Sequence, residues 1–217
     1  MKRFFASLLL LFLLLALSPA ALARQQAIVY SSRGVQVPAI VTAPEGAAAF
    51  PVVVMVHGHG GNKDEHRGFP AIAAELAADG IGSIRMDLPG CGESAEPFTA
   101  SCLSANKADV RAAVRYARDV LGASSVGLFG YSMGGRAVLE LLAEGDRPDA
   151  CALLAPAADT QDLIQTAFED FDALHEEARA HGSARQFFSG GHYDELGLAF
   201  FDDLLACDDP ALEAGLA

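Results

Sequence analysis

The stretch that decides the fold is residues 125–143, which read SVGLFGYSMGGRAVLELLA. Its first five residues are typical of a short strand, and Met133–Ala143 reads as a helix. Between them, Gly130–Gly134 has the pattern Gly-x-Ser-x-Gly. A turn this sharp forces the central Ser132 into strained backbone space, and the flanking glycines let the strand and the helix pass closely. The pattern therefore predicts a nucleophilic hydroxyl at the end of a strand.

On both sides of this turn, short apolar runs alternate with segments of helical spacing. Further strands are expected at 27–31, 35–42, 51–57, 83–87 and 150–154. The 51–57 run has no polar alternation, which is typical of a central parallel strand buried on both faces. Helices are expected at 69–77 and at 104–121, with Ser104 as the N-cap of the second and Gly122 as its stop. These repeated units predict an α/β fold, a mostly parallel sheet with helices on both faces.

A second glycine-rich loop follows the 51–57 strand, where residues 57–61 read HGHGG. Loops at the carboxyl ends of parallel strands meet at one edge of the sheet, so this loop should lie beside Ser132. Acyl transfer through a serine passes an anionic tetrahedral intermediate that needs two N–H donors, and losing one typically costs ~3 kcal/mol. The candidates for this oxyanion hole are the backbone amides of His59 and Met133, the latter at a helix N-terminus.

Other motifs are excluded by their spacing. The pair His57 and His59 would need an Asp at 61 and a His at 62 to form a hydrolytic zinc loop, where the chain has Gly61 and Asn62. The sequence has neither a P-loop nor a Gly-x-Gly-x-x-Gly after a strand. Its net charge of −13 argues against nucleic acid as a partner, because binding there needs clustered Lys and Arg. We therefore expect no metal and no cofactor.

The N-terminus has the composition of an export signal. Lys2 and Arg3 precede an apolar run at 4–17, and residues 21–23 read Ala-Leu-Ala. The run is shorter than the ~20 residues that a membrane-spanning helix needs. We expect residues 1–23 to be cleaved as a signal peptide, the chain to be exported to the periplasm or the medium, and no stable membrane insertion afterwards. The alternative is an uncleaved anchor.

The C-terminal part of the chain is strongly acidic. Residues 159–217 hold fourteen Asp and Glu against two Arg, whereas residues 24–158 are nearly balanced. Helices are expected at 163–179 and at 196–207, and the acidic residues are most simply a solvated, solubilising face. This break divides the mature chain into an α/β core at 24–158 and an acidic helical, lid-like region at 159–217.

The four cysteines have no Cys-x-x-Cys spacing and so match no zinc pattern. Cys151 lies in the apolar run 150–154 and is expected to be a buried small hydrophobe. Cys91 and Cys102 flank a loop that contains Pro and Ser. They are the one pair for which we expect a disulfide, with two unpaired loop cysteines as the alternative.

Three loops together carry a family resemblance. Residues 57–65 read HGHGGNKDE, residues 87–94 read DLPGCGES, and residues 130–134 read GYSMG. On these motifs the chain resembles the α/β-hydrolase family over about residues 26–158. Within that family it is similar to the bacterial serine esterases that include cinnamoyl and feruloyl esterases.

The resemblance implies roles for particular residues. Ser132 would be the nucleophile, the amides of His59 and Met133 would form the oxyanion hole, and His57 would brace the oxyanion loop. Carboxylic esters or related acyl compounds of small size would be the substrates. The oligomeric state is not indicated.

The catalytic acid and histidine cannot be carried over in the same way. In this family they follow two further strands, but no run rich in Val and Ile follows residue 154. Residues 163–207 resemble the family's helical lid, so the fold is expected to be incomplete, as in a chain truncated at its C-terminus. His175 is expected on an exposed helical face, and His181 and His192 border glycines. None of the three follows a strand, and the acid and the base stay unassigned.

Three functions remain open at this point. The first is an exported serine esterase. The second is a hydrolase-like protein impaired in catalysis because it lacks the acid and the histidine. The third is a serine peptidase or an acyltransferase, which the same motifs would serve because a fold does not fix its substrate.

Overall fold

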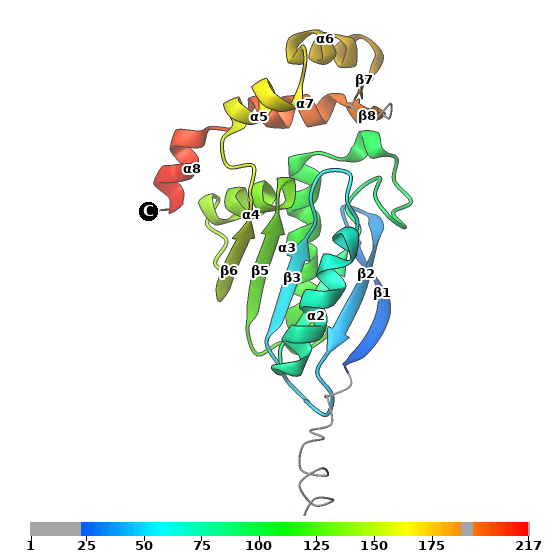
Figure 1. Ribbon diagram of the computed structural model, residues 1–217, viewed down its shortest axis with the longest axis vertical. Coiled ribbons are helices and arrows are strands. Elements are labelled where there is room, and N and C mark those ends of the chain that lie inside the picture. Colours follow the sequence, from blue (N-terminus) through cyan, green and yellow to red (C-terminus); the bar gives the residue numbers. More distant parts are fainter. Residues whose placement is uncertain (1–22, 188–192, 217) are drawn as a thin grey trace, which may run out of the picture.

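The fold is a twisted sheet flanked by helices, with a further layer of helices over one end of the strands (Figure 1). The computed structural model describes residues 23–187 and 193–216. The main sheet has the order β1-β2-β4-β3-β5-β6, in which β3 to β6 are parallel and β2 is antiparallel to both β1 and β4. The strands are β1 (Arg24–Ser32), β2 (Val35–Ala43), β3 (Val52–Val56), β4 (Gly82–Met86), β5 (Val126–Tyr131) and β6 (Ala150–Leu154).

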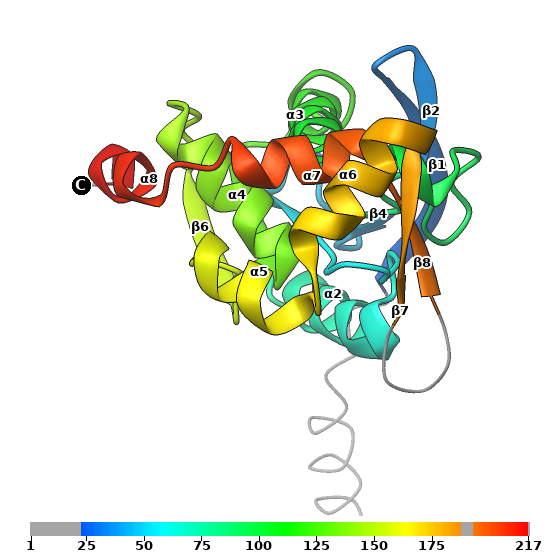
Figure 2. The same cartoon turned by 90° about the horizontal axis from the view of Figure 1, so that it is seen from above.

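The predicted α/β fold is confirmed. Strand β3 lies at the centre of the sheet, and the side chains of Val54, Met55 and Val56 are fully buried, as its continuous apolar sequence predicts. Helix α2 (Gly68–Ala78) covers one face, while α3 (Leu103–Asp119) and α4 (Met133–Ala143) cover the other (Figure 2). The carboxyl ends of the parallel strands lie beneath the further layer of helices (Figure 1).

Helix α3 does not begin in the way the sequence predicts. Its N-cap residue is Cys102, and Ser104 lies within its first turn. Both the N–H and the hydroxyl of Ser104 donate to the carboxylate of Asp203, at 2.6 and 2.9 Å. The carboxylate of Asp203, 99 residues away, thus accepts the hydrogen bond that a local cap was expected to accept. The sequence around Ser104 gives no sign of this contact.

Residues after 158 form the lid region above the sheet. It contains α5 (Thr160–Ala167), α6 (Phe171–His181), β7 (Ser183–Phe187), β8 (Tyr193–Gly197), α7 (Leu198–Leu205) and α8 (Asp209–Leu216). The single helix expected at 163–179 is wrong, because Asp159 and Asp170 each cap the N-terminus of a separate helix. The hairpin of β7 and β8 was not expected either, since neither strand is rich in β-branched residues.

One acidic residue of this region, Asp209, forms hydrogen bonds that connect the lid region to the core. The carboxylate of Asp209 accepts hydrogen bonds from the N–H and the hydroxyl of Thr160 and from Arg136 Nη1, the last at 2.7 Å. Arg136 lies on α4 and is only 1% exposed; its guanidinium also binds Glu140 and the carbonyl of Ala158. Asp209 therefore ties the start of α8 to the helix that follows Ser132.

An apolar cluster joins the lid region to the core. Phe171, Phe200, Phe201 and Leu204 of the lid pack in one cluster with Met133, the first residue of α4. Because Met133 directly follows Ser132, the lid is docked against the helix that carries the candidate nucleophile. Figure 1 shows this layer lying across the carboxyl ends of the strands.

The last strand of the sheet corrects another expectation. Strand β6 pairs only with β5 among the described residues, and Cys151, its second residue, is exposed rather than buried. Leu154 at its end is 52% exposed. The apolar composition of β6 suits a buried strand, but its position at the edge of the sheet leaves it open to solvent.

The predicted signal peptide lies almost wholly outside the described residues, and β1 begins at Arg24, where the mature chain is expected to start. In the part of the chain that the structure covers, no helix has the length and apolar character needed to cross a membrane.

Candidate active site

Ser132 lies at the sharp turn between β5 and α4. Its backbone has φ 51° and ψ −120°, a conformation that residues with a side chain rarely adopt. Its N–H donates to the carbonyl of Leu154 at 3.1 Å, and its hydroxyl does not cap the helix. The strained turn that the Gly-x-Ser-x-Gly pattern predicts is therefore present, with a half-buried hydroxyl at its tip.

The glycines of this turn permit contacts that no larger residue would allow. A Cβ atom on Gly134 would lie 2.3 Å from the carbonyl oxygen of Val56, and one on Gly130 would lie 2.7 Å from the Cα of Gly135. Real Cβ atoms essentially never come this close to backbone atoms. Helix α4 can thus pass directly against the end of β3, which brings the loop after β3 beside Ser132.

His57 begins this loop and is buried in it. Its Nδ1 lies 2.8 Å from the carbonyl oxygen of Gly58, and its Nε2 accepts the N–H of Leu88 at 3.1 Å. Burial lowers the pKa of His57, so that the ring is neutral with its proton on Nδ1. Both ring nitrogens are used to join two loops, which is the bracing position expected for this residue.

The backbone amides beside Ser132 decide where an oxyanion could bind. A Cβ built on Gly58 would lie 3.2 Å from the Cβ of Ser132, so the loop passes directly beside Ser132. The N–H of Gly58 is already bound to Glu65 Oε2 at 2.9 Å, which leaves His59 as the next amide along the loop. On the other side, the N–H of Met133 has no acceptor among residues 23–187 and 193–216.

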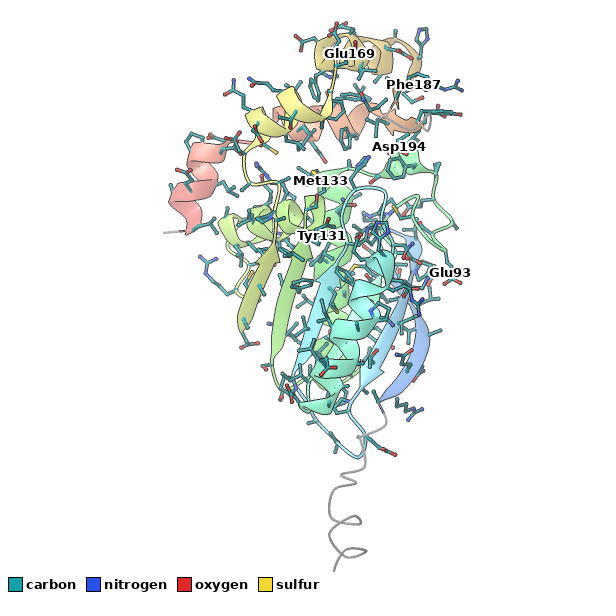
Figure 3. All side chains as sticks on the ribbon, viewed as in Figure 1. Glu93, Tyr131, Met133, Glu169, Phe187 and Asp194 are labelled. Atoms are coloured by element: carbon teal, nitrogen blue, oxygen red, sulfur yellow. The ribbon has the colours of Figure 1, made fainter. Side chains whose placement is uncertain are left out.

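The side chain of His59 connects this loop to the lid. Its Nε2 lies 3.0 Å from Oδ2 of Asp194 on β8. The imidazole also makes edge-to-face contacts with Phe98 and with Phe200 of α7. Figure 3 shows Asp194 on the lid side of the gap and Met133 at the end of the sheet below it.

A comparison with protein families decides the identity of this architecture. The model of a family described as the alpha/beta hydrolase fold matches residues 51–192, well over half of the chain. The chain belongs to the α/β-hydrolase family. The matched residues include the loop after β3, the turn at Ser132 and most of the lid.

One curated relative of this chain is an esterase. The chain is 32% identical to esterase EstD of Thermotoga maritima over 126 residues, which are 56% of this chain and 30% of EstD. The chain thus spans less than a third of the length of that curated relative.

Solved structures share the fold at lower identity. Est1E from Butyrivibrio proteoclasticus, solved with ferulic acid bound, superposes with a TM-score of 0.67 at 21% identity, over 86% of this chain and 73% of Est1E. A putative hydrolase from Agrobacterium vitis S4 gives a TM-score of 0.63 at 23% identity, over 85% of this chain and 72% of that one.

None of the histidines whose rings the structure describes is hydrogen-bonded to Ser132. His175 was expected at the surface but is 5% exposed, because its ring stacks on Phe201 and its Nε2 bonds Asp202 Oδ1 at 2.8 Å. His181 is exposed at the end of α6. His192 lies outside the described residues. The acid and the base of the hydrolase therefore stay unassigned.

The expected disulfide is absent from the structure. Cys91 and Cys102 are free thiols that line a small cavity between the loop after β3 and the start of α3. Burial raises the pKa of Cys91 to about 12 and that of Cys102 to about 11. Since a thiolate is the species that forms disulfides, these two cavity thiols are poorly disposed to pair. Met133 lines the same cavity, whereas Ser132 does not.

No metal site was expected, and no group of three or more metal-ligating side chains occurs where side chains are described. Two residues at this site carry no functional signal in the sequence. Asp194 has the pattern of an acidic surface residue, and it meets His59 only because the fold brings the two segments together. Glu65 lies only seven residues from Gly58, but its side chain reaches that amide only because of the backbone conformation of the loop.

Proposed function

We propose that this chain is a serine hydrolase that acts on carboxylic esters through an acyl-enzyme at Ser132. The observation that carries the proposal is the strained turn at Ser132, with φ 51°, held against the glycine-rich loop after β3. Backbone strain of this kind persists where the surrounding structure enforces it, and it is concentrated at functional sites. Membership of a family with esterase relatives supports the same chemistry.

The geometry suits the attack step of acyl transfer. The Ser132 hydroxyl would attack the ester carbonyl, and the amides of His59 and Met133 would donate hydrogen bonds to the carbonyl oxygen and so stabilise the negative charge that develops on it. Met133 begins α4, so the helix dipole would favour the anion as well. Collapse of the intermediate would expel the alcohol and leave Ser132 acylated.

Activation of the Ser132 hydroxyl is the step of the reaction that the site supports least. A serine without a general base is a poor nucleophile at neutral pH, and the described rings of His57, His59 and His175 are bound to other partners. Catalysis without a complete triad still reaches about 10³- to 10⁴-fold over the uncatalysed rate. We therefore expect slow turnover, which also keeps a catalytically impaired hydrolase-like protein as a second candidate.

Acylation of Ser132 by p-nitrophenyl acetate tests the proposal. Mass spectrometry should find an acetyl group on Ser132 of the wild-type protein, and Ser132→Ala should lose it. Acetylation of other residues alone would contradict the proposed nucleophile. Steady-state turnover should fall below the usual enzyme range of about 1 to 10³ s⁻¹. A rate inside that range, abolished by Ser132→Ala, would show that a base exists, and His181→Ala and His192→Ala would then locate it.

The substrate class is proposed as small carboxylic esters. A panel that compares activated esters, peptides and acyl transfer to an added alcohol would separate an esterase from a peptidase or an acyltransferase on the same fold. Preference for transfer or for peptides would replace the esterase proposal.

We also propose export after cleavage at Ala23, on the strength of the charged start and the Ala-Leu-Ala sequence at 21–23. Mass spectrometry of the mature N-terminus checks it. A chain that keeps Met1 in an exported fraction would contradict cleavage.

A further inference from the structure

The loop after β3 ends in a left-handed turn that its sequence does not favour. Glu65, His66 and Arg67 have φ values of 37°, 53° and 72°, and none of them is a glycine. Residues with a Cβ avoid this region because the Cβ approaches the carbonyl oxygen. Three such residues in a row persist only where other contacts hold them in place.

The contacts that hold the turn are made by Glu65. Its side chain is only 9% exposed, whereas that of His66 is 94% exposed. Glu65 folds back so that its Oε2 accepts the N–H of Gly58 at 2.9 Å. A Cβ on Gly61 would lie 2.5 Å from the same oxygen, so the carboxylate occupies the inside of the loop. The left-handed turn is the backbone arrangement that lets Glu65 reach there.

Gly58 is the residue at which this contact meets the proposed catalytic site. Its N–H is bound to Glu65, and its carbonyl oxygen lies 3.1 Å from the N–H of Gly61 and 2.8 Å from Nδ1 of His57. A Cβ built on Gly58 would lie 3.2 Å from the Cβ of Ser132. Both polar groups of Gly58 are therefore fixed. Because the peptide after Gly58 carries the N–H of His59, the orientation of that amide follows from the bonds made by Gly58.

We propose that Glu65 is a positioning residue for the oxyanion loop, which it orients by binding the N–H of Gly58 from within the loop. The inference rests on the proposed function, since it assigns a purpose to the His59 amide. Glu65 acts through geometry and not through its charge, because a carboxylate close to a developing oxyanion would oppose it. A neutral acceptor of the same shape should therefore replace it.

Three variants separate positioning from a purely structural role. Glu65→Ala removes the acceptor, and Glu65→Gln keeps a carbonyl oxygen at the same reach. His66→Gly relieves a positive φ and removes only the long pair between His66 Nε2 and Glu65 Oε1 at 3.7 Å, so the contact of Oε2 with Gly58 is left in place. Hydrogen exchange at the Gly58 amide should rise at least tenfold in Glu65→Ala and stay near the wild-type rate in the other two. Acetylation of Ser132 by p-nitrophenyl acetate should fall at least tenfold in Glu65→Ala only.

The possible outcomes are distinct. Wild-type acetylation and wild-type Gly58 exchange in Glu65→Ala would overturn the inference, as would loss of acetylation in Glu65→Gln with the Gly58 amide still protected. If Glu65→Ala does not fold, Glu65→Asp, whose side chain is too short to reach Gly58, takes its place. If the wild-type protein is not acetylated at Ser132, the proposed function fails. The exchange rate of Gly58 then still decides whether Glu65 holds the loop.

Discussion

Replacing Gly134 with alanine should force α4 away from the end of β3. The added Cβ would lie 2.3 Å from the carbonyl oxygen of Val56 and 2.4 Å from that of His57, both backbone atoms. Ordinary contact begins near 3.4 Å, so the helix and the strand would have to separate by about 1 Å. Overpacking in a core costs about 1–3 kcal/mol, and more where the neighbours cannot yield.

Because two backbone carbonyls oppose the new atom, the upper end of that range applies. Alanine regains up to about 1 kcal/mol of helix propensity. We expect Gly134→Ala to lower the free energy of unfolding by about 2 kcal/mol or more and to displace the adjacent Met133 amide, which would slow acetylation of Ser132.

Gly68→Ala is the matched control for this substitution. Gly68 begins α2, has a helical φ of −70°, and has no atom within 4 Å of its Cβ position. The same change there should raise the free energy of unfolding by about 0.5–1 kcal/mol. Urea denaturation of both variants measures the two values. A Gly134→Ala protein within 0.5 kcal/mol of the wild type, roughly the scatter of neutral substitutions, would refute the close-passage argument.

Further predictions concern backbone strain, one ion pair and the cysteines. Ser132→Gly should raise the free energy of unfolding by about 1–3 kcal/mol because glycine tolerates φ 51°; a loss of stability would show that the turn is not strained. Burial opposes the shift, but hydrogen bonds from Thr160 and Arg136 lower the pKa of Asp209 below its usual 3.8. The contribution of Asp209 to the free energy of unfolding is therefore fully present above pH 3.8, and it is lost as the pH falls through the lowered pKa. Asp209→Asn should cost roughly 1–2 kcal/mol at pH 7 and less at pH 3, and an equal loss at both would contradict this. Cys151 should react with a thiol reagent in the native protein because it is exposed, although partial burial raises its pKa, while the two buried cavity thiols should react only after unfolding; their failure to react in denatured, unreduced protein would reveal the disulfide instead.

The sequence predicts the core well, because the burial of β3 and the turn at Ser132 depend on residues that are neighbours in the chain. The unbroken apolar run of β3 predicts burial on both faces, and the structure has it. The glycines around Ser132 predict a close passage of strand and helix, because only glycine permits it. For β6 the same reasoning fails at Cys151, since burial of a strand depends on a neighbour that its own residues do not specify.

Contacts between distant segments account for the other differences. The exposed position expected for His175 follows from its helical neighbours, but Phe201 and Asp202 of α7 pack over it. Asp203 replaces the local cap expected for α3 from across the lid.

The sequence by itself determined the order of strands and helices in the core at 24–158, the turn at Ser132 and the family, because these depend on residues close together in the chain. Only the tertiary structure decided what surrounds Ser132. It placed Glu65 inside the loop after β3, Asp194 on His59 and the lid phenylalanines on Met133. The last two contacts form only when the fold brings distant segments to one edge of the sheet. The first depends on the conformation that the loop adopts in the folded chain, so none of the three can be read from residues that are neighbours in the sequence.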